Sequence, residues 1–167
     1  MTDDRHQHFM DSNVRRPDDI PPIVPLTWLA DKHAHHGDRL LNNLLPDDFP
    51  HDVDRGTAGD ALTLLALGTA LRRSVEQHRG VDIHQALTLG ATWAEVALAL
   101  DVDTERARTW LQAWADGQRS LYLLAESEGH QPMGLSASQH AAVVALTERG
   151  DGEALPPNAS DPGEASA

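Results

Sequence analysis

The sequence predicts an all-α protein, a compact multi-helix domain flanked by disordered termini. Apolar residues recur through the middle of the chain at the three- and four-residue spacing of helices, and no useful length of chain alternates apolar and polar residues as a strand does. Proline, glycine and acidic residues gather near both ends, in segments too poor in bulky apolar side chains to fold alone. With 167 residues and 40% hydrophobic content, the chain is long enough to bury one core.

These patterns divide the chain into five segments. Residues 1–25 are polar and then proline-rich, which predicts a disordered arm. Residues 26–45 are predicted to form an amino-terminal helical segment, and residues 46–59, which combine proline, glycine and acid, a loop or linker. Residues 60–149 are the predicted helical core. Residues 150–167 are rich in proline, glycine and acid, so we expect a disordered acidic tail.

Glycines mark the expected ends of several helices. Gly37 is expected to interrupt the amino-terminal helical segment. The strongest helical pattern begins at the start of the predicted core and is expected to stop close to Gly80. Asp82 would then cap a short helix that ends at Gly90.

Residues 92–114 contain two short amphipathic helices joined by a tight turn. Thr92 and Glu95 have the spacing of a capping box, and Asp103 can cap the second helix with its side-chain oxygen. Only about three residues separate the helices, which predicts a helix-turn-helix. Each helix has apolar residues at i, i+3, i+4 and i+7: Trp93, Val96, Ala97 and Leu100, then Ala107, Trp110, Leu111 and Trp114. The tryptophans of these stripes are predicted to pack in the core rather than to stack on bases.

The chain after this motif is expected to remain helical. The second helix should continue past Gly117 to about Ala125. Ser136 and Gln139 repeat the capping-box spacing, which predicts a last helix that ends near Arg149.

Charge is unfavourable for nucleic-acid binding, which depends on cations. The chain has 13 basic and 26 acidic residues, a net charge of −13. The acid is concentrated in the flanks, since residues 56–125 carry only −2, against −5 for residues 1–55 and −6 for residues 126–167. The middle of the chain is therefore nearly neutral.

The motif resembles the helix-turn-helix segments of many actinobacterial DNA-binding proteins, over about 25 residues. The matching residues are Gly90, Ala91, Trp93, Ala94, Glu95, Val96, Ala97, Leu100, Val102 and Ala107. Asp101 and Asp103 depart from the family, which usually has glycine at the turn and serine or threonine at the cap. The resemblance implies a DNA-binding protein that acts as a transcriptional regulator or accessory factor.

Six outward side chains of the second helix are the DNA contacts that this resemblance implies. A helix-turn-helix places the amino-terminal half of its second helix against base edges in the major groove. Arginine suits guanine or phosphate, glutamine suits adenine, glutamate suits cytosine, and threonine suits a phosphate or a thymine methyl group. The candidates are Thr104, Glu105, Arg106, Arg108, Thr109 and Gln112, with further cations in Arg72, Arg73 and Arg79. Ordinary solvated residues on a helical domain would show the same pattern, so both interpretations stay open.

The expected partner is double-stranded DNA, bound by a homodimer because one such motif reads few base pairs. In the alternative, the chain is a protein–protein interaction module. The helix-turn-helix is then only a scaffold, and the amino-terminal helices or the acidic tails bind another protein.

No catalytic motif is present, so we do not expect an enzyme or a cofactor. The sequence has no phosphate-cradling glycine loop, no nucleophile elbow, no cysteine and no metalloprotease signature. His33 and His36 share a helix face and could hold a metal with a nearby carboxylate, but no second ligand pair at fixed spacing supports a site. No metal is predicted.

We expect a soluble, cytoplasmic protein that does not bind membranes. The first residues lack the basic-then-apolar layout of a signal peptide, and no run approaches the roughly 20 apolar residues that span a bilayer. The absence of cysteine is compatible with a reducing compartment.

Overall fold

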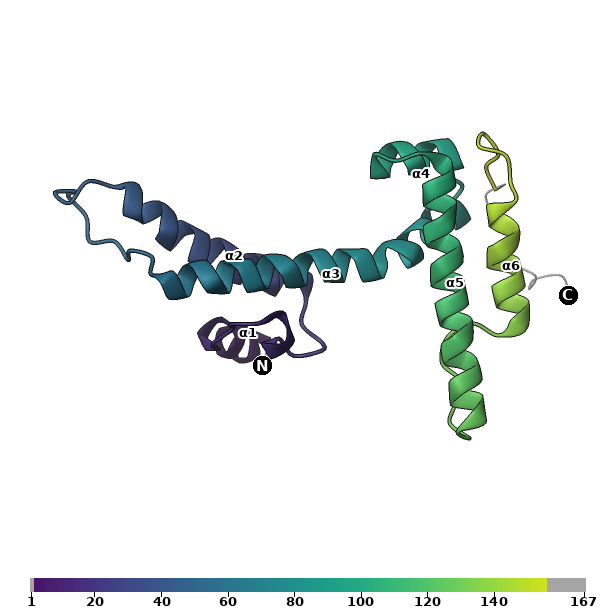
Figure 1. Ribbon diagram of the computed structural model, residues 1–167, viewed down its shortest axis with the longest axis horizontal. Helices are drawn as coiled ribbons and strands as arrows, with labels where there is room; N and C mark the ends of the chain where they lie inside the picture. The colour runs from purple at the N-terminus through teal and green to yellow at the C-terminus, as the bar shows by residue number, and fades with distance from the viewer. Residues whose placement is uncertain (1, 156–167) are drawn as a thin grey trace, which may run out of the picture. The chain divides into compact units, whose positions relative to one another are not determined.

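Every regular element in the described part of the chain is helical. The computed structural model describes residues 2–155, and within this range it has six α-helices and two 3-10 helices but no strand (Figure 1). They are α1 (Thr2–Asp11), η1 (Pro17–Asp19), α2 (Leu26–Leu41), η2 (Asn42–Leu44), α3 (Ala58–Thr88), α4 (Trp93–Leu100), α5 (Thr104–Ser127) and α6 (Ala137–Thr147). The predicted all-α fold is therefore confirmed for residues 2–155. None of these helices is long and apolar enough to cross a membrane.

The chain forms two compact units, an amino-terminal unit up to Gln77 and a carboxyl-terminal unit from His78. The 31 residues of α3 run across this boundary, so α3 contributes to both units. This division differs from the predicted one, in which a linker separates the first helices from a core that begins at residue 60. The difference arises because the first half of α3 packs against α2 rather than joining the helices that follow it.

The amino-terminal unit orders most of the segment that the sequence predicts to be a disordered arm. α1 and η1 lie within residues 1–25. The physical reason is long-range burial: Phe9 and Val14 are buried with Leu29 and Leu67 of α2 and α3. The ammonium group of Lys32 is also buried, and it donates hydrogen bonds to three carbonyl groups at the end of α1, those of Phe9, Met10 and Ser12, at 2.8, 2.6 and 2.6 Å. It thereby adds a cationic donor at the carboxyl end of α1, where the carbonyl of Phe9 also accepts from the amide and hydroxyl of Ser12.

Gly37 does not interrupt α2, which runs unbroken from Leu26 to Leu41, so that prediction is wrong. Leu64 of α3 packs at this glycine, with its Cδ1 atom 3.8 Å from the position of a Cβ atom added to Gly37. The glycine thus lies on the packed face of a helix. A glycine inside a helix costs only about 1 kcal/mol relative to alanine, which packing against a neighbouring helix can offset.

Asp60 joins α2 to the start of α3. Its carboxylate accepts hydrogen bonds from the hydroxyl and amide of Thr57, at 2.6 and 2.7 Å, and lies 2.8 Å from Nδ1 of His36 and 3.4 Å from Nη1 of Arg39. The hydrogen bonds from Thr57, followed by His36, hold the pKa of Asp60 far below its usual range. His36 is therefore engaged by a single carboxylate. Among the described residues, no group of three or more potential ligands is arranged to hold a metal ion.

The carboxyl-terminal unit is built around a core contributed by α3, α4, α5 and α6. Its buried residues are Ile83, Leu87, Trp93, Val96, Ala107, Leu111, Ala115 and Val143. Trp110 and Trp114 are partly buried against it. The predicted packing of the motif tryptophans into the core is therefore confirmed, and Trp93, which is fully buried, donates from its indole nitrogen to the carbonyl of Leu146 in α6 at 2.8 Å.

α3 does not stop at Gly80, and Asp82 begins no new helix, so both predictions are wrong. The reason lies in α5, because Trp114 packs against Gly80 so closely that a Cβ atom there would overlap its Cβ and Cγ atoms. The glycine serves helix–helix approach, while the helix continues through it to Thr88.

Three of the helix starts predicted from capping residues, those after Thr92, Asp103 and Ser136, are confirmed. Thr92 and Glu95 form a reciprocal capping box at the start of α4, and Ser136 and Gln139 form one at the start of α6. Asp103 caps α5. α5 passes Gly117 and ends at Ser127, close to the predicted end. These signals are reliable because each interaction joins residues only three apart.

The predicted acidic tail, residues 150–167, lies outside the described residues from 156 onward. Its first part is tied to the carboxyl-terminal unit: the backbone amide of Ala94 donates to the carbonyl of Asp151 at 3.0 Å. The hydroxyl of Thr104 donates to the carboxylate of the same aspartate at 3.1 Å. Residues around Asp151 thus bridge the starts of α4 and α5.

Candidate nucleic-acid interface

The connection between α4 and α5 is a three-residue turn with defined geometry. Asp101 has a left-handed backbone conformation, with φ 53° and ψ 47°, which aspartate tolerates better than most side chains. The next amide, that of Val102, donates back to the carbonyl of Ala97 at 3.1 Å, and the Val102 side chain packs against the core. Asp103 then accepts a hydrogen bond from the amide of Arg106 at 2.7 Å and starts α5. The turn therefore sets the direction in which α5 leaves α4.

Arg108, a candidate DNA contact, is used inside the molecule. Its Nε atom donates to the carbonyl of Thr147 at 2.9 Å, and Nη2 donates to the carbonyl of Arg149. The same group pairs with the carboxylate of Asp151 at 2.9 Å and lies over the ring of Trp93, 4.8 Å from its centroid. Its side chain is only 16% exposed. Arg108 thus donates hydrogen bonds to carbonyl groups at and just after the carboxyl end of α6, where a cation is favourable.

The other candidates differ in how exposed their side chains are. Thr104, which binds Asp151, and Gln112, which donates to Asp116 at 3.1 Å, are partly buried like Arg108. The exposed candidates are Glu105, Arg106 and Thr109. The hydroxyl of Thr109 donates to the carbonyl of Glu105 at 3.0 Å, the bond that a threonine inside a helix can make to the carbonyl four residues earlier. The structure therefore leaves one cation among the three exposed candidates.

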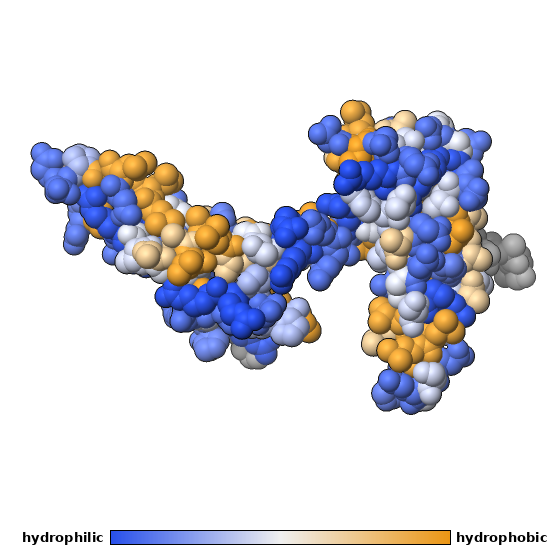
Figure 2. Space-filling view, viewed as in Figure 1, coloured by the Kyte–Doolittle hydropathy of each residue, from blue (hydrophilic) through white to orange (hydrophobic). Residues whose placement is uncertain are grey.

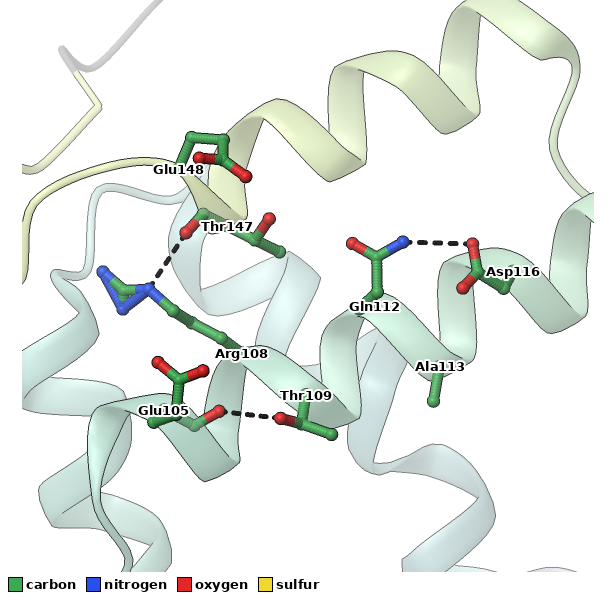
Figure 3. Close-up of a pocket in the computed structure, with 8 residues that line it drawn as sticks. All are labelled: Glu105, Arg108, Thr109, Gln112, Ala113, Asp116, Thr147 and Glu148. Atoms are coloured by element: carbon green, nitrogen blue, oxygen red, sulfur yellow. Dashed lines mark hydrogen bonds between the residues drawn. The ribbon is translucent and has the colours of Figure 1, made fainter.

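A groove between α5 and α6 contains four of the six candidates. It has a volume of about 530 Å³ (Figure 3), and its lining residues are Glu105, Arg108, Thr109, Gln112, Ala113, Asp116, Thr147 and Glu148. Figure 3 shows Arg108 directed at Thr147 and Gln112 directed at Asp116, so their polar groups are already engaged. The charged lining residues are three carboxylates, Glu105, Asp116 and Glu148, and one guanidinium, Arg108, which is already paired with Asp151. This groove is therefore electrostatically unsuited to a phosphate.

Asp116 keeps its charge in this groove. Nε2 of His140 lies 2.7 Å from its carboxylate, and Gln112 donates to the same oxygen atom. These hydrogen bonds, that of His140 first, lower the pKa of Asp116. The groove thus remains acidic at neutral pH.

Two arginines contact the ring of Trp110 at the start of α5. The guanidinium carbon of Arg79 is 4.1 Å from the ring centroid, and that of Arg106 is 5.3 Å away. Such contacts hold a cation at an aromatic surface without neutralising it. Arg79, which the sequence proposed as an additional cation, therefore contacts the same tryptophan ring as Arg106.

Arg72 and Arg73, the other proposed cations, belong to the amino-terminal unit. Arg72 pairs with Glu76 at 3.1 Å, one turn later in α3, and Arg73 pairs with Asp18 at 3.3 Å. Each arginine is thus balanced by a carboxylate.

Sequence reasoning missed two residues of this region, Asp151 and His140. Asp151 binds Thr104 and Arg108 from a segment whose composition predicts disorder. His140 pairs with Asp116 across 24 residues of sequence. Neither contact has a local sequence signal, because each depends on the way α6 returns along α5.

Comparisons of the chain with protein-family models, with curated proteins and with solved structures found no match. A functional assignment therefore depends on the geometry of α4 and α5 and on the charges around them.

Proposed function

We propose that this chain binds double-stranded DNA through α4 and α5, as a helix-turn-helix regulator or accessory factor. The observation that carries this proposal is the turn: left-handed Asp101, inward Val102 and capping Asp103 connect two helices. The first turns of the second helix expose Glu105, Arg106 and Thr109. In a helix-turn-helix, those first turns are the part that enters the major groove.

The DNA-contact surface in this proposal includes fewer residues of α5 than the six that the sequence predicts. Arg106 and Thr109 are the exposed residues suited to base edges or phosphates, and Glu105 is suited to a cytosine amino group. Arg79 adds a second cation beside Trp110. Arg108 does not belong to the contact surface in this proposal. Its hydrogen bonds hold the end of α6 against α5 and so support the exposed residues of α5.

Acidic side chains should make this binding weak and strongly dependent on salt. The described part of the carboxyl-terminal unit has eleven acidic residues and five arginines. Asp101, Asp103 and Glu105 lie next to Arg106 in sequence, where phosphates would approach. Each carboxylate near the backbone of DNA opposes the cation contacts that supply affinity.

Fluorescence anisotropy with labelled duplex DNA tests the proposal, first at low salt and then over a salt series. Wild-type protein should bind at low salt, and its affinity should fall as salt rises. Arg106→Ala should weaken binding on the order of tenfold, and Glu105→Gln should strengthen it. Arg72→Ala, an exposed arginine of the amino-terminal unit with the same change in net charge, is the matched control and should bind like the wild type.

No binding at low salt, or equal loss with Arg72→Ala and Arg106→Ala, would reject α5 as a DNA-contact helix. The first outcome would show that the protein does not bind duplex DNA. The second would show that DNA binding depends on the net charge of the protein and not on α5.

A second candidate function, binding of another protein, is favoured by one observation in the amino-terminal unit. Four leucines at the end of α2, in η2 and at the start of α3 are exposed: Leu41, Leu44, Leu62 and Leu65. Exposed apolar groups of this kind mark interaction surfaces. A protein that co-purifies from the native host with the wild-type chain, but not with Leu62→Glu/Leu65→Glu, would support this function.

A further inference from the structure

Three hydrogen-bond donors from α4 and α5 converge on Asp151, a residue that follows α6. The amide of Ala94, in the first turn of α4, donates to the carbonyl of Asp151 at 3.0 Å. The hydroxyl of Thr104, the first residue of α5, donates to its carboxylate at 3.1 Å. Nη2 of Arg108 pairs with the same carboxylate at 2.9 Å. One residue outside α4 and α5 thus engages donors from both helices of the proposed DNA-binding motif.

Donors of these three kinds also bind phosphate groups. Proteins contact the backbone of DNA mainly through arginine and lysine, through hydroxyl groups and through amides at the starts of helices. In a helix-turn-helix, the first helix crosses that backbone while the second enters the groove beside it. A carboxylate can take the place of a phosphate on such donors, because both are anions whose oxygen atoms accept the same hydrogen bonds. The donor set that engages Asp151 is therefore suited to a phosphate.

This donor set is distinct from the acidic groove between α5 and α6. Arg108 lines that groove, but Ala94, Thr104 and Asp151 do not. The donors lie at the end of α5 where α4 joins it and where α6 finishes (Figure 1). Figure 2 shows mainly hydrophilic surface at this end of α5, as contact with the polar backbone of a nucleic acid requires.

The contact with Asp151 can be exchanged for another anion. The side chain of Asp151 is 59% exposed, whereas that of Arg108 is only 16% exposed. An ion pair with so exposed a carboxylate contributes little stability. Arg108 also keeps its hydrogen bonds to the carbonyls at the end of α6 when its anionic partner changes. Gly150 and Gly152 flank Asp151, so the backbone around it can rearrange with little steric cost.

We infer that Asp151 occupies a phosphate-binding site in the free protein and so inhibits binding there. The site is formed by Ala94, Thr104 and Arg108, and a phosphate group displaces the carboxylate when it binds. This inference rests on the proposed function, in which the DNA backbone supplies the phosphate; free phosphate is the other source with the same chemistry. Thr104 and Arg108 then contact DNA through this site. Affinity is lowered because only molecules whose carboxylate has moved away are competent to bind.

Asp151→Asn tests the competition, with Glu153→Gln as the matched control. Each variant replaces a carboxylate by an amide of the same size in the same segment, so the net charge changes equally. Among the described residues, the carboxylate of Glu153 accepts a hydrogen bond only from the amide of Gly150, at 3.1 Å. In fluorescence anisotropy with duplex DNA at low salt, Asp151→Asn should bind about tenfold more tightly than the wild type, and Glu153→Gln at most about twofold.

Equal gains in the two variants would show a general effect of charge and would overturn the inference, although DNA binding itself would stand. The inference is overturned in the same way if Asp151→Asn binds DNA no more tightly than the wild type. Circular dichroism should show the same helix content in all three proteins, because both substitutions keep the size of the side chain.

Inorganic phosphate tests the same site without DNA. In a nuclear magnetic resonance titration, millimolar phosphate should shift the amide signals of Ala94 and Thr104 in Asp151→Asn, and several-fold less in the wild type and in Glu153→Gln. Such shifts in Asp151→Asn, with no DNA binding by any variant, would support the phosphate site and reject the DNA backbone as its source of phosphate. Unchanged signals of both amides in Asp151→Asn would overturn the site, whether or not the protein binds DNA.

Discussion

Trp114 of α5 packs directly against Gly80 of α3, in the place where any other residue would carry a side chain. The contact brings two helices together at the core of the carboxyl-terminal unit, next to Ile83 and Leu111. It also explains why α3 continues through a glycine, because the glycine is required by the neighbouring helix and not by the end of its own.

Gly80→Ala should destabilise the fold, whereas Gly117→Ala should stabilise it. At Gly80 a Cβ atom would overlap Trp114, and overpacking of this kind costs about 1–3 kcal/mol. At Gly117 the methyl group meets no described atom, so the higher helix propensity of alanine should add up to about 1 kcal/mol. Urea unfolding followed by tryptophan fluorescence measures both, at a protein concentration low enough to exclude self-association. The same direction of change in both variants would contradict the packing at Gly80.

Arg108→Ala should reduce the free energy of unfolding by about 2–4 kcal/mol, because it leaves the carbonyls of Thr147 and Arg149 and the carboxylate of Asp151 without their partner. Arg106→Ala is the control. It removes one contact with Trp110 and should cost less than about 1 kcal/mol. Urea midpoints of the two variants give the comparison. Equal stability of the two variants would show that α6 does not depend on Arg108.

Asp101→Gly and Asp101→Ala should change stability in opposite directions. The left-handed backbone at Asp101 suits glycine, so the glycine variant should gain about 0.5–1 kcal/mol, while alanine, which lacks the polar side chain, should lose stability. Thermal unfolding measures this difference.

The same two variants separate charge from backbone geometry in DNA binding. Both remove one carboxylate beside the proposed contact helix, so both should raise affinity for DNA equally. If only the glycine variant binds more tightly, the turn geometry and not the charge limits binding.

Acid should destabilise the amino-terminal unit through Asp60. The pKa of this carboxyl is lower in the folded state than its unfolded value of about 4, so its ionised form stabilises the fold above that pH, and the stability is lost as the pH falls below it. Asp60→Asn should therefore be less stable than the wild type at neutral pH and should lose less on acidification. Near-ultraviolet circular dichroism with a pH series checks this. Asp38→Asn, at an exposed aspartate of α2, should follow the wild type.

Local sequence determined the helix starts of the carboxyl-terminal unit. Thr92 with Glu95, Ser136 with Gln139, and Asp103 with the amide of Arg106 each act over three residues, so the chain needs no tertiary contact to form them. Apolar spacing likewise determined which side of α4 and α5 is buried, because a helix of regular period can hide only one stripe.

Tertiary structure decided what the glycines and the long polar side chains do. Glycine is unfavourable inside a helix, so the sequence predicts a helix break at Gly37 and a helix end near Gly80. Each glycine instead lies where another helix packs. Arg108 has the position of a DNA contact, and its actual partners lie 39 and 41 residues later, at the end of α6. Lys32 orders α1 from 20 or more residues away. A glycine gains its role from the neighbour that approaches it, and an arginine or lysine reaches whichever carbonyl groups the fold leaves without partners. Sequence spacing determines neither, because both depend on chain segments that only the folded packing brings together.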